Sequence, residues 1–121
     1  MIDSAWARAF AAEWVDAWNS HDLDRILSHY TDDFEMSSPL IVERMGVAEG
    51  VLRGKRAIRP YWQQGLDAHP PLRFELRDVL AGVRTIVIYY RRTTTRTRMA
   101  AEVLTLNEEG KVVAGAAAYA D

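Results

Sequence analysis

The sequence contains no cysteine, and its only histidines, His21, His29 and His69, lie far apart. The absence of cysteine excludes disulfide bonds, thiolate zinc sites, CxxC redox chemistry and a cysteine nucleophile. The three histidines show none of the spacings that bring metal ligands together on one element. We therefore expect a protein that binds no metal and uses no cofactor.

The sequence also lacks a dominant charge and a long apolar run. It has 15 Lys and Arg against 17 Asp and Glu, a net charge of −2, and this balance argues against a nucleic-acid partner held by bulk charge. No apolar stretch reaches the roughly 18–20 residues of a membrane span, and the charged start Met1–Arg8 is not typical of a signal peptide. We expect a cytoplasmic protein without a nucleic-acid or membrane partner.

The composition is typical of one globular domain, and the first half of the chain predicts helices. The 121 residues are 49% hydrophobic and 26% charged, which predicts a single domain over residues 1–121 with a core of its own. Apolar residues recur at steps of three and four in Trp6–Trp18, in Leu23–Tyr30 and again in Lys55–Ala68. This spacing predicts three amphipathic helices.

The segments outside these helices predict strands and one long loop. Residues alternate in Phe34–Ser38, a short strand that Pro39 should end, whereas residues 40–54 contain three glycines and no period, which predicts a loop. The second half is β in pattern, with strands expected at Leu72–Arg77, Ile86–Tyr90, Met99–Leu106 and Lys111–Tyr119.

The apolar run Ile86–Tyr90 predicts a central strand covered on both faces. Helices followed by an antiparallel meander indicate an α+β fold, in which a curved sheet wraps around the helices. Such a sheet leaves a hollow, which either side chains or a ligand would fill.

Glu102 is the candidate catalytic residue, because it is the only charged side chain in the apolar stretch Met99–Leu104. A loop at Asn107–Gly110 would place Glu102 opposite Gly115 on the neighbouring strand. Burial raises the pKa of a carboxyl group or forces it to find a partner. Two interpretations stay open: a neutral acid that donates a proton in a pocket, or a structural ion pair with an arginine such as Arg91.

Several aromatic side chains project from the elements that should line the hollow: Trp14, Trp18, Tyr61, Trp62, Tyr89 and Tyr119. They are either ordinary core residues or the walls of an apolar small-molecule pocket. The arginines around the hairpin Arg92–Thr97 either keep a sheet edge solvated or form an anion-binding mouth. The Ser38 hydroxyl fits a satisfied group before a proline turn better than a nucleophile.

Three segments, Phe10–Asp24, Tyr30–Phe34 and Gly54–Trp62, contain the patterns A-W-N-x-x-D-L-D, Y-x-D-D-F and G-K-x-A-I, and Gly110–Val113 closes the series. Together they span nearly the whole chain, which resembles the SnoaL-like branch of the nuclear transport factor 2-like superfamily. The resemblance implies a cone-shaped α+β roll, also called cystatin-like, with a ligand cavity between sheet and helices. It further implies a homodimer formed through the outer face of the sheet.

Proteins of this superfamily include steroid isomerases, polyketide cyclases, dehydratases and non-enzymatic binders. By resemblance to steroid isomerases, Trp14 stands at the position of an oxyanion-binding tyrosine, Ser38 at that of the general base and Glu102 at that of a protonated oxyanion-hole acid. Only Glu102 keeps the chemical type.

The resemblance implies isomerase, cyclase or dehydratase chemistry on a carbonyl-bearing apolar substrate, and it leaves a non-catalytic ligand-binding or dimerisation module as the alternative. Glu102 is the expected catalytic residue. The expected ligand contacts are Trp14, Trp18, Met36, Ser38, Tyr61, Trp62, Tyr89, Arg91 and Tyr119.

Overall fold

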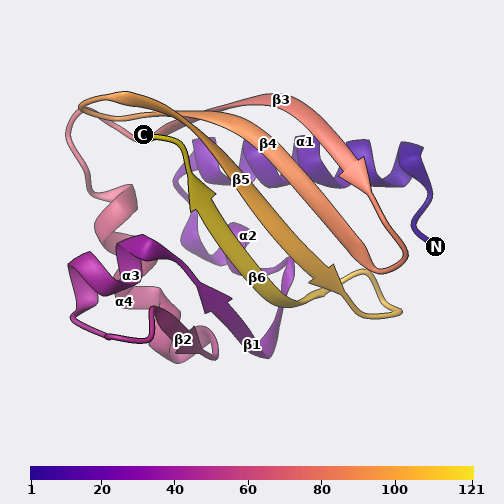
Figure 1. Cartoon of the computed structure of the whole chain (residues 1–121), viewed down its shortest axis with the longest axis horizontal. Helices are drawn as coiled ribbons and strands as arrows, with labels where there is room; N and C mark the ends of the chain where they lie inside the picture. Colours follow the sequence, from indigo (N-terminus) through magenta and orange to yellow (C-terminus); the bar gives the residue numbers. More distant parts are fainter.

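The computed structural model describes residues 1–121 and has the α+β architecture that the sequence predicts. Helices dominate the first half of the chain and strands the second (Figure 1). In chain order the elements are α1 (Ser4–Ser20), α2 (Leu23–Leu27), β1 (Tyr30–Ser37), α3 (Pro39–Met45), β2 (Val51–Arg53), α4 (Lys55–Leu66), β3 (Arg73–Ala81), β4 (Thr85–Thr93), β5 (Thr97–Leu106) and β6 (Val112–Tyr119).

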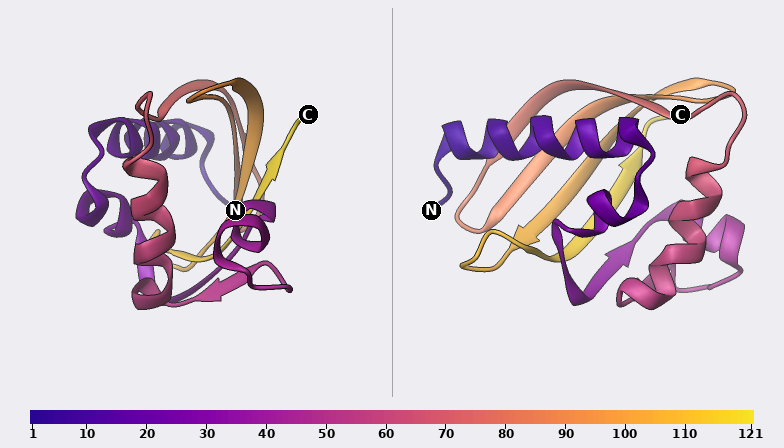
Figure 2. Two further views of the ribbon diagram at one scale, coloured as in Figure 1. Left: turned by 90° about the vertical axis from the view of Figure 1, so that its left-hand side faces the viewer. Right: turned by 180° about the vertical axis from the view of Figure 1, so that it is seen from behind.

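All strands form one sheet in the order β2-β1-β6-β5-β4-β3. Every neighbouring pair is antiparallel except β1 and β6, which run parallel. The sheet is curved and open, and α1, α2 and α4 lie on its concave side (Figure 2). The predicted fold class is therefore confirmed, and the space between sheet and helices is where a site would lie.

Helix α1 forms because its apolar residues follow the helical period and its start is capped. The Asp3 carboxylate accepts a hydrogen bond from the Trp6 N–H at 2.9 Å, which satisfies one of the free amide groups of the first turn. The helix ends at Ser20, and the following residue, His21, adopts a left-handed conformation with φ 59°. Phe10, Trp14 and Trp18 form its buried face, and α1 packs against β3. None of the helices is long and apolar enough to cross a bilayer.

The predicted loop over residues 40–54 is wrong, because this segment contains α3 and β2. Ser38 caps α3 through its Oγ, which accepts from the Leu40 N–H at 3.1 Å, and Pro39 stands in the first turn. Leu40 and Ile41 are buried, so tertiary packing stabilises a helix too short to show a clear period. Tyr30 was also predicted in a helix, whereas it begins β1.

The predicted pairing of the last hairpin is shifted. Glu102 faces Ala117 and not Gly115, because the register changes between Thr105 and Leu106. Leu106 consequently pairs with Val112 and not with Lys111. A shift of two residues keeps every side chain on its original face, so Glu102 still points toward the concave side.

Strand β4 is not covered on both faces in one copy of the chain, contrary to the prediction. Ile86, Ile88 and Tyr90 are buried on the concave side, where the helices lie. Val87 is only half-buried and Tyr89 is 41% exposed on the opposite face. The apolar run therefore contributes side chains to both faces of the sheet, and no helix covers the outer face (Figure 2).

Candidate functional site

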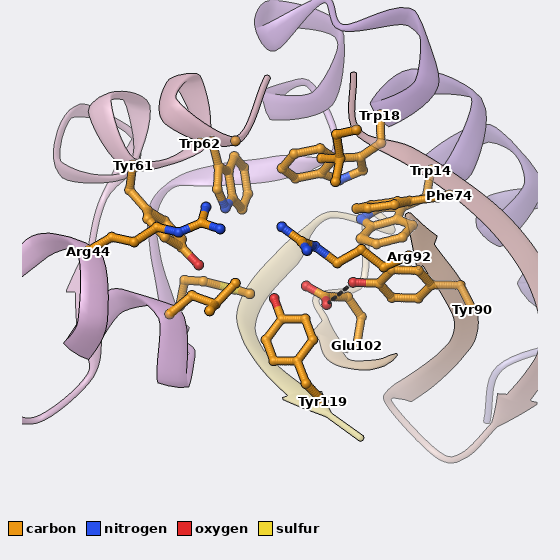
Figure 3. A pocket seen from close by; sticks show the side chains of 14 residues that line it. Trp14, Trp18, Arg44, Tyr61, Trp62, Phe74, Tyr90, Arg92, Glu102 and Tyr119 are labelled. Carbon is orange, nitrogen blue, oxygen red and sulfur yellow. Dashed lines mark hydrogen bonds between the residues drawn. The ribbon is translucent and has the colours of Figure 1, made fainter. Parts of the chain in front are cut away.

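Glu102 lies at the centre of the candidate site. It stands on β5, is 4% exposed, and accepts a hydrogen bond on Oε2 from the Tyr90 hydroxyl at 3.0 Å (Figure 3). No arginine, lysine or histidine forms an ion pair with it. Burial raises the pKa of Glu102 from its ordinary 4.5 to about 8, although the Tyr90 hydrogen bond and the nearby Arg92 charge oppose this rise. The carboxyl group is therefore mainly neutral at pH 7.

Glu102 borders a cavity of about 40 Å³ between the sheet, α1, α3 and α4. This volume accommodates on the order of three water molecules. Its walls are mainly aromatic, with Trp14, Trp18, Trp62 and Phe74, and Met36, Leu40, Gly65 and Leu72 complete the apolar part. The polar groups on its surface belong to Arg44, Tyr61, Tyr90, Arg92, Glu102 and Tyr119.

Two arginines reach this cavity from opposite sides. Arg92 extends from β4 and is buried, at 7% exposure, whereas Arg44 extends from the last turn of α3 and is exposed. Figure 3 shows both guanidinium groups directed toward the middle of the cavity. Neither side chain has a hydrogen-bond or ion-pair partner within the chain. Arg92 makes a cation–π contact with the Tyr119 ring, whose centroid lies 5.9 Å from Arg92 Cζ.

The indole N–H groups of the two cavity tryptophans differ in their partners. Trp14 Nε1 donates to the Tyr30 hydroxyl at 2.9 Å, so its single donor is already used. Trp18 Nε1 is buried and has no hydrogen-bond partner. An unsatisfied buried donor is rare in folded proteins and calls for an explanation, such as a water or ligand that occupies the site.

The tyrosine hydroxyls around the cavity remain protonated. Burial raises the pKa of Tyr61, of Tyr90 and of Tyr119 above its ordinary value of 10. Tyr61 donates to Ser38 Oγ at 3.3 Å, and Tyr119 directs its hydroxyl into the cavity (Figure 3). These groups can donate hydrogen bonds at neutral pH but cannot act as bases.

The structure brings most of the predicted site residues together. Glu102 and six of the expected contact residues border the cavity: Trp14, Trp18, Met36, Tyr61, Trp62 and Tyr119. Ser38 is buried next to them, but its hydroxyl caps α3 and accepts from Tyr61, and it does not line the cavity. It therefore has no base that would make it a nucleophile, and it is not itself a base.

Two of the predicted contacts on β4 are wrong by one position. Tyr89 and Arg91 are exposed on the outer face, and their neighbours Tyr90 and Arg92 point into the cavity. Successive side chains of a strand point to opposite faces, so an error of one residue moves a side chain across the sheet. The proposed ion pair between Glu102 and Arg91 consequently does not form.

The register of the hairpin with β5 identifies the residues of β4 that face the cavity, and the apolar run Ile86–Tyr90 does not reveal this register by itself. The hairpin between β4 and β5 pairs Thr93 with Thr97, and counting back from this pair places Ile88 opposite Glu102. Tyr90 and Arg92 follow on the same face as Ile88. No pattern in the sequence pointed to Arg44, because its helix was predicted as a loop. Phe74 was predicted in a strand but was not named as a site residue.

Comparison with known proteins identifies the family. The SnoaL-like domain matches residues 11–117 of the chain. The protein belongs to the SnoaL-like domain family. A SnoaL-like protein of unknown function from Burkholderia thailandensis has 48% sequence identity and a TM-score of 0.93, with 99% of this chain and 98% of that chain covered.

Other solved structures share the fold at lower sequence identity. The epoxide hydrolase/cyclase-like enzyme SalBIII, described in pyran ring formation in the polyether salinomycin, has 21% identity and a TM-score of 0.81, covering 99% and 95% of the two chains. An NTF2-like protein from Cytophaga hutchinsonii has 11% identity and a TM-score of 0.73, covering 94% and 89%. No curated protein matches the sequence. The predicted SnoaL-like family is therefore confirmed, and the fold is similar to that of an NTF2-like protein.

Proposed function

We propose that this protein binds a small, mainly apolar molecule with a carbonyl group, and that Glu102 transfers a proton to and from that group. The observation that carries the proposal is the position of Glu102: it borders the cavity, is 4% exposed, and keeps one carboxyl oxygen free of any partner. A carboxyl group with a pKa of about 8 holds its proton at neutral pH and can still release it. The chemistry is that of an isomerase, cyclase or dehydratase.

In this mechanism Glu102 donates its proton to the carbonyl oxygen while the α-carbon of the ligand loses a proton to water. The enol that forms returns its hydroxyl proton to the Glu102 carboxylate when the carbon is protonated again. The Tyr90 hydroxyl, 3.0 Å from Oε2, stabilises the carboxylate in between. The unpartnered Trp18 N–H and the Tyr119 hydroxyl can donate hydrogen bonds to the carbonyl oxygen and polarise it as the α-carbon loses its proton.

The site differs from the arrangement that the resemblance to steroid isomerases implies. Trp14 donates to Tyr30, and Ser38 caps a helix, so neither can perform the role at the aligned position. Glu102 is the only carboxyl group in the cavity, and no histidine lines it. One acid that works with water supports proton transfer through a single protein group rather than a relay between two protein residues.

A ligand-binding module without turnover is the second candidate. It is favoured by the same lack of a protein base among the residues that line the cavity. Both candidates require a ligand to occupy the site, whereas only the first requires Glu102 to exchange its proton with that ligand.

Deuterium exchange separates these candidates. Small aromatic cyclic ketones are incubated with the protein in D₂O, and deuterium incorporation at the α-carbon is measured by mass spectrometry. We expect wild type to catalyse exchange and Glu102→Gln to bind the same ketone with unchanged affinity but exchange it at least 100-fold more slowly. Glu108→Gln, in the exposed turn after β5, is the control. If wild type binds the ketone without exchanging it, the second candidate is supported. If Glu102→Gln exchanges the ketone as fast as wild type does, the first candidate is refuted.

Binding itself is measured by tryptophan fluorescence. Trp14, Trp18 and Trp62 border the cavity, whereas Trp6 is exposed and outside it. A Trp6→Phe background therefore removes the signal that does not report on the site. Unchanged emission across the whole panel in this background would indicate a filled core and would contradict both candidates.

We also propose that the protein is a cytoplasmic homodimer that buries the outer face of the sheet. A row of apolar residues crosses that face through paired positions on four strands: Leu80, Val87, Val103 and Ala116. Leu80 is 54% and Val103 39% exposed in the single chain. An exposed apolar surface on a curved sheet favours association with a second copy.

A further inference from the structure

The arginine pair in the cavity is not explained by proton transfer to a ketone. Arg92 is 7% exposed, and its cross-strand neighbours are Phe74 and Arg98, so no acidic residue flanks it on the sheet. A buried cation normally has an anionic partner, because its removal from water costs several kcal/mol. Arg92 lies over the Tyr119 ring, 5.9 Å from its centroid, and near Glu102, but it forms no ion pair with that carboxyl group.

The exposed Arg44 does not supply the anionic partner that Arg92 lacks, because it is also positively charged. Its guanidinium approaches the cavity from α3 and faces that of Arg92 across it (Figure 3). Like charges that converge without an anion between them repel each other. Two guanidinium groups on one cavity are, however, a common way to hold a carboxylate, since each offers parallel N–H donors.

The charge of the cavity supports an anionic occupant. Its charged residues are Arg44, Arg92 and Glu102. With Glu102 neutral the lining carries two positive charges, and with Glu102 ionised it still carries one. The unpartnered Trp18 N–H adds a further hydrogen-bond donor, which comes from helix α1. Apart from the free Glu102 oxygen, the unsatisfied polar groups on this surface therefore donate hydrogen bonds.

We infer that the ligand is an aromatic or similarly flat apolar carboxylic acid, bound as its carboxylate by Arg92 and Arg44. The inference rests on the proposed function for the presence of a ligand and adds the anionic group that fixes its orientation. The apolar body would lie against Trp18, Trp62 and Phe74, and its reacting carbonyl would face Glu102.

The small volume of the cavity indicates that Arg44 must also move to admit the ligand. The cavity of about 40 Å³ is too small for an aromatic acid as it stands. Arg44 is exposed, long and unpartnered, so it can swing outward to admit the ligand and then close on the carboxylate. Arg92 is held by its burial and supplies the fixed contact.

The test compares 2-naphthoate with its uncharged methyl ester, by tryptophan fluorescence in the Trp6→Phe background and by calorimetry. We expect wild type to bind 2-naphthoate at least tenfold more tightly than the ester, with an affinity that falls as salt concentration rises. Arg92→Gln should weaken binding of 2-naphthoate at least tenfold and leave the ester unchanged. Arg91→Gln is the matched control, one residue away on the outer face, and should change neither.

Equal binding of acid and ester by wild type would overturn the inference, and this comparison requires no variant to fold. Equal weakening by Arg91→Gln and Arg92→Gln would also overturn it, since the effect would then be one of net charge. Tighter binding of 2-naphthyl phosphate than of 2-naphthoate would refute the carboxylate assignment. If 2-naphthoate binds in an arginine-dependent way and no ketone is exchanged, the inference holds and the proposed catalysis is refuted. If ketones are exchanged but the acid binds no more tightly than the ester, the proposed catalysis holds and the inference is refuted.

Discussion

Replacement of Glu102 by glutamine is expected to stabilise the protein at neutral pH. In the unfolded chain the carboxyl group ionises near 4.5, whereas in the folded protein it retains its proton up to about pH 8. Folding at pH 7 therefore requires Glu102 to take up a proton, and this uptake lowers the free energy of unfolding. Glutamine is neutral in both states, has nearly the same shape, and can accept the Tyr90 hydrogen bond through its amide oxygen.

The size of the effect follows from the two pKa values. Each pH unit between the unfolded and folded pKa changes stability by about 1.4 kcal/mol, so the cost at pH 7 is about 3 kcal/mol. Below pH 4.5 both states are protonated and the cost vanishes. Above about pH 8 both are ionised and the cost is constant. Wild type should therefore lose stability relative to Glu102→Gln as pH rises from 4.5 to 8, and not outside that window.

Urea unfolding curves at intervals between pH 4.5 and 9 measure this difference directly. The difference in unfolding free energy between Glu102→Gln and wild type should grow with pH and then level off. Glu108→Gln removes an equal charge from the exposed turn and should stay within about 0.5 kcal/mol of wild type. A difference that does not change with pH, or a mutant less stable by about 3–5 kcal/mol as for a broken buried ion pair, would refute the neutral-acid assignment.

Further substitutions test the surroundings of this carboxyl group and the outer sheet face. Tyr90→Phe removes the only hydrogen bond to Glu102 and should cost about 1–3 kcal/mol in urea unfolding. It should also raise the Glu102 pKa further, and an unchanged carboxyl titration by ¹³C NMR would contradict this. Gly115→Ala places a methyl group 2.9 Å from Met36 Sδ, which should destabilise the protein by about 1–3 kcal/mol in thermal melts; an unchanged melting temperature would show that Met36 moves aside freely. Val103→Lys should convert the proposed dimer to a monomer in light scattering without loss of the fold, and a wild type that is monomeric at micromolar concentration would refute the dimer.

The sequence predicted the helices and strands best where burial repeats along the chain. The three- and four-residue steps in α1 and the alternation in β3 to β6 are local patterns, because each element exposes one side to water and buries the other. Helix α3 was missed for the opposite reason. It has seven residues, and the packing of Leu40 and Ile41 rather than a periodic pattern holds it in place.

Most of the site residues named from the sequence border the cavity, and the two misplaced residues on β4 have a physical cause. Glu102 stood out as a charge in an apolar strand, and the tryptophans of α1 shared its buried face. Tyr89 and Arg91 were chosen in place of Tyr90 and Arg92 because an apolar run on β4 gives no alternation from which to tell the two faces apart. The pairing of β4 with β5 decides that question, and it is a property of two segments together.

The sequence by itself determined the fold class, the family and the presence of one buried acid, since each depends on composition, local period or the residues of a motif. Only the tertiary structure decided what surrounds that acid. Tyr90 became its partner and Arg91 did not, because hairpin register sets which side chains share a face. Arg44 and Arg92 come from α3 and β4, and their convergence on one cavity follows from the curvature of the sheet around the helices, which no stretch of neighbouring residues encodes.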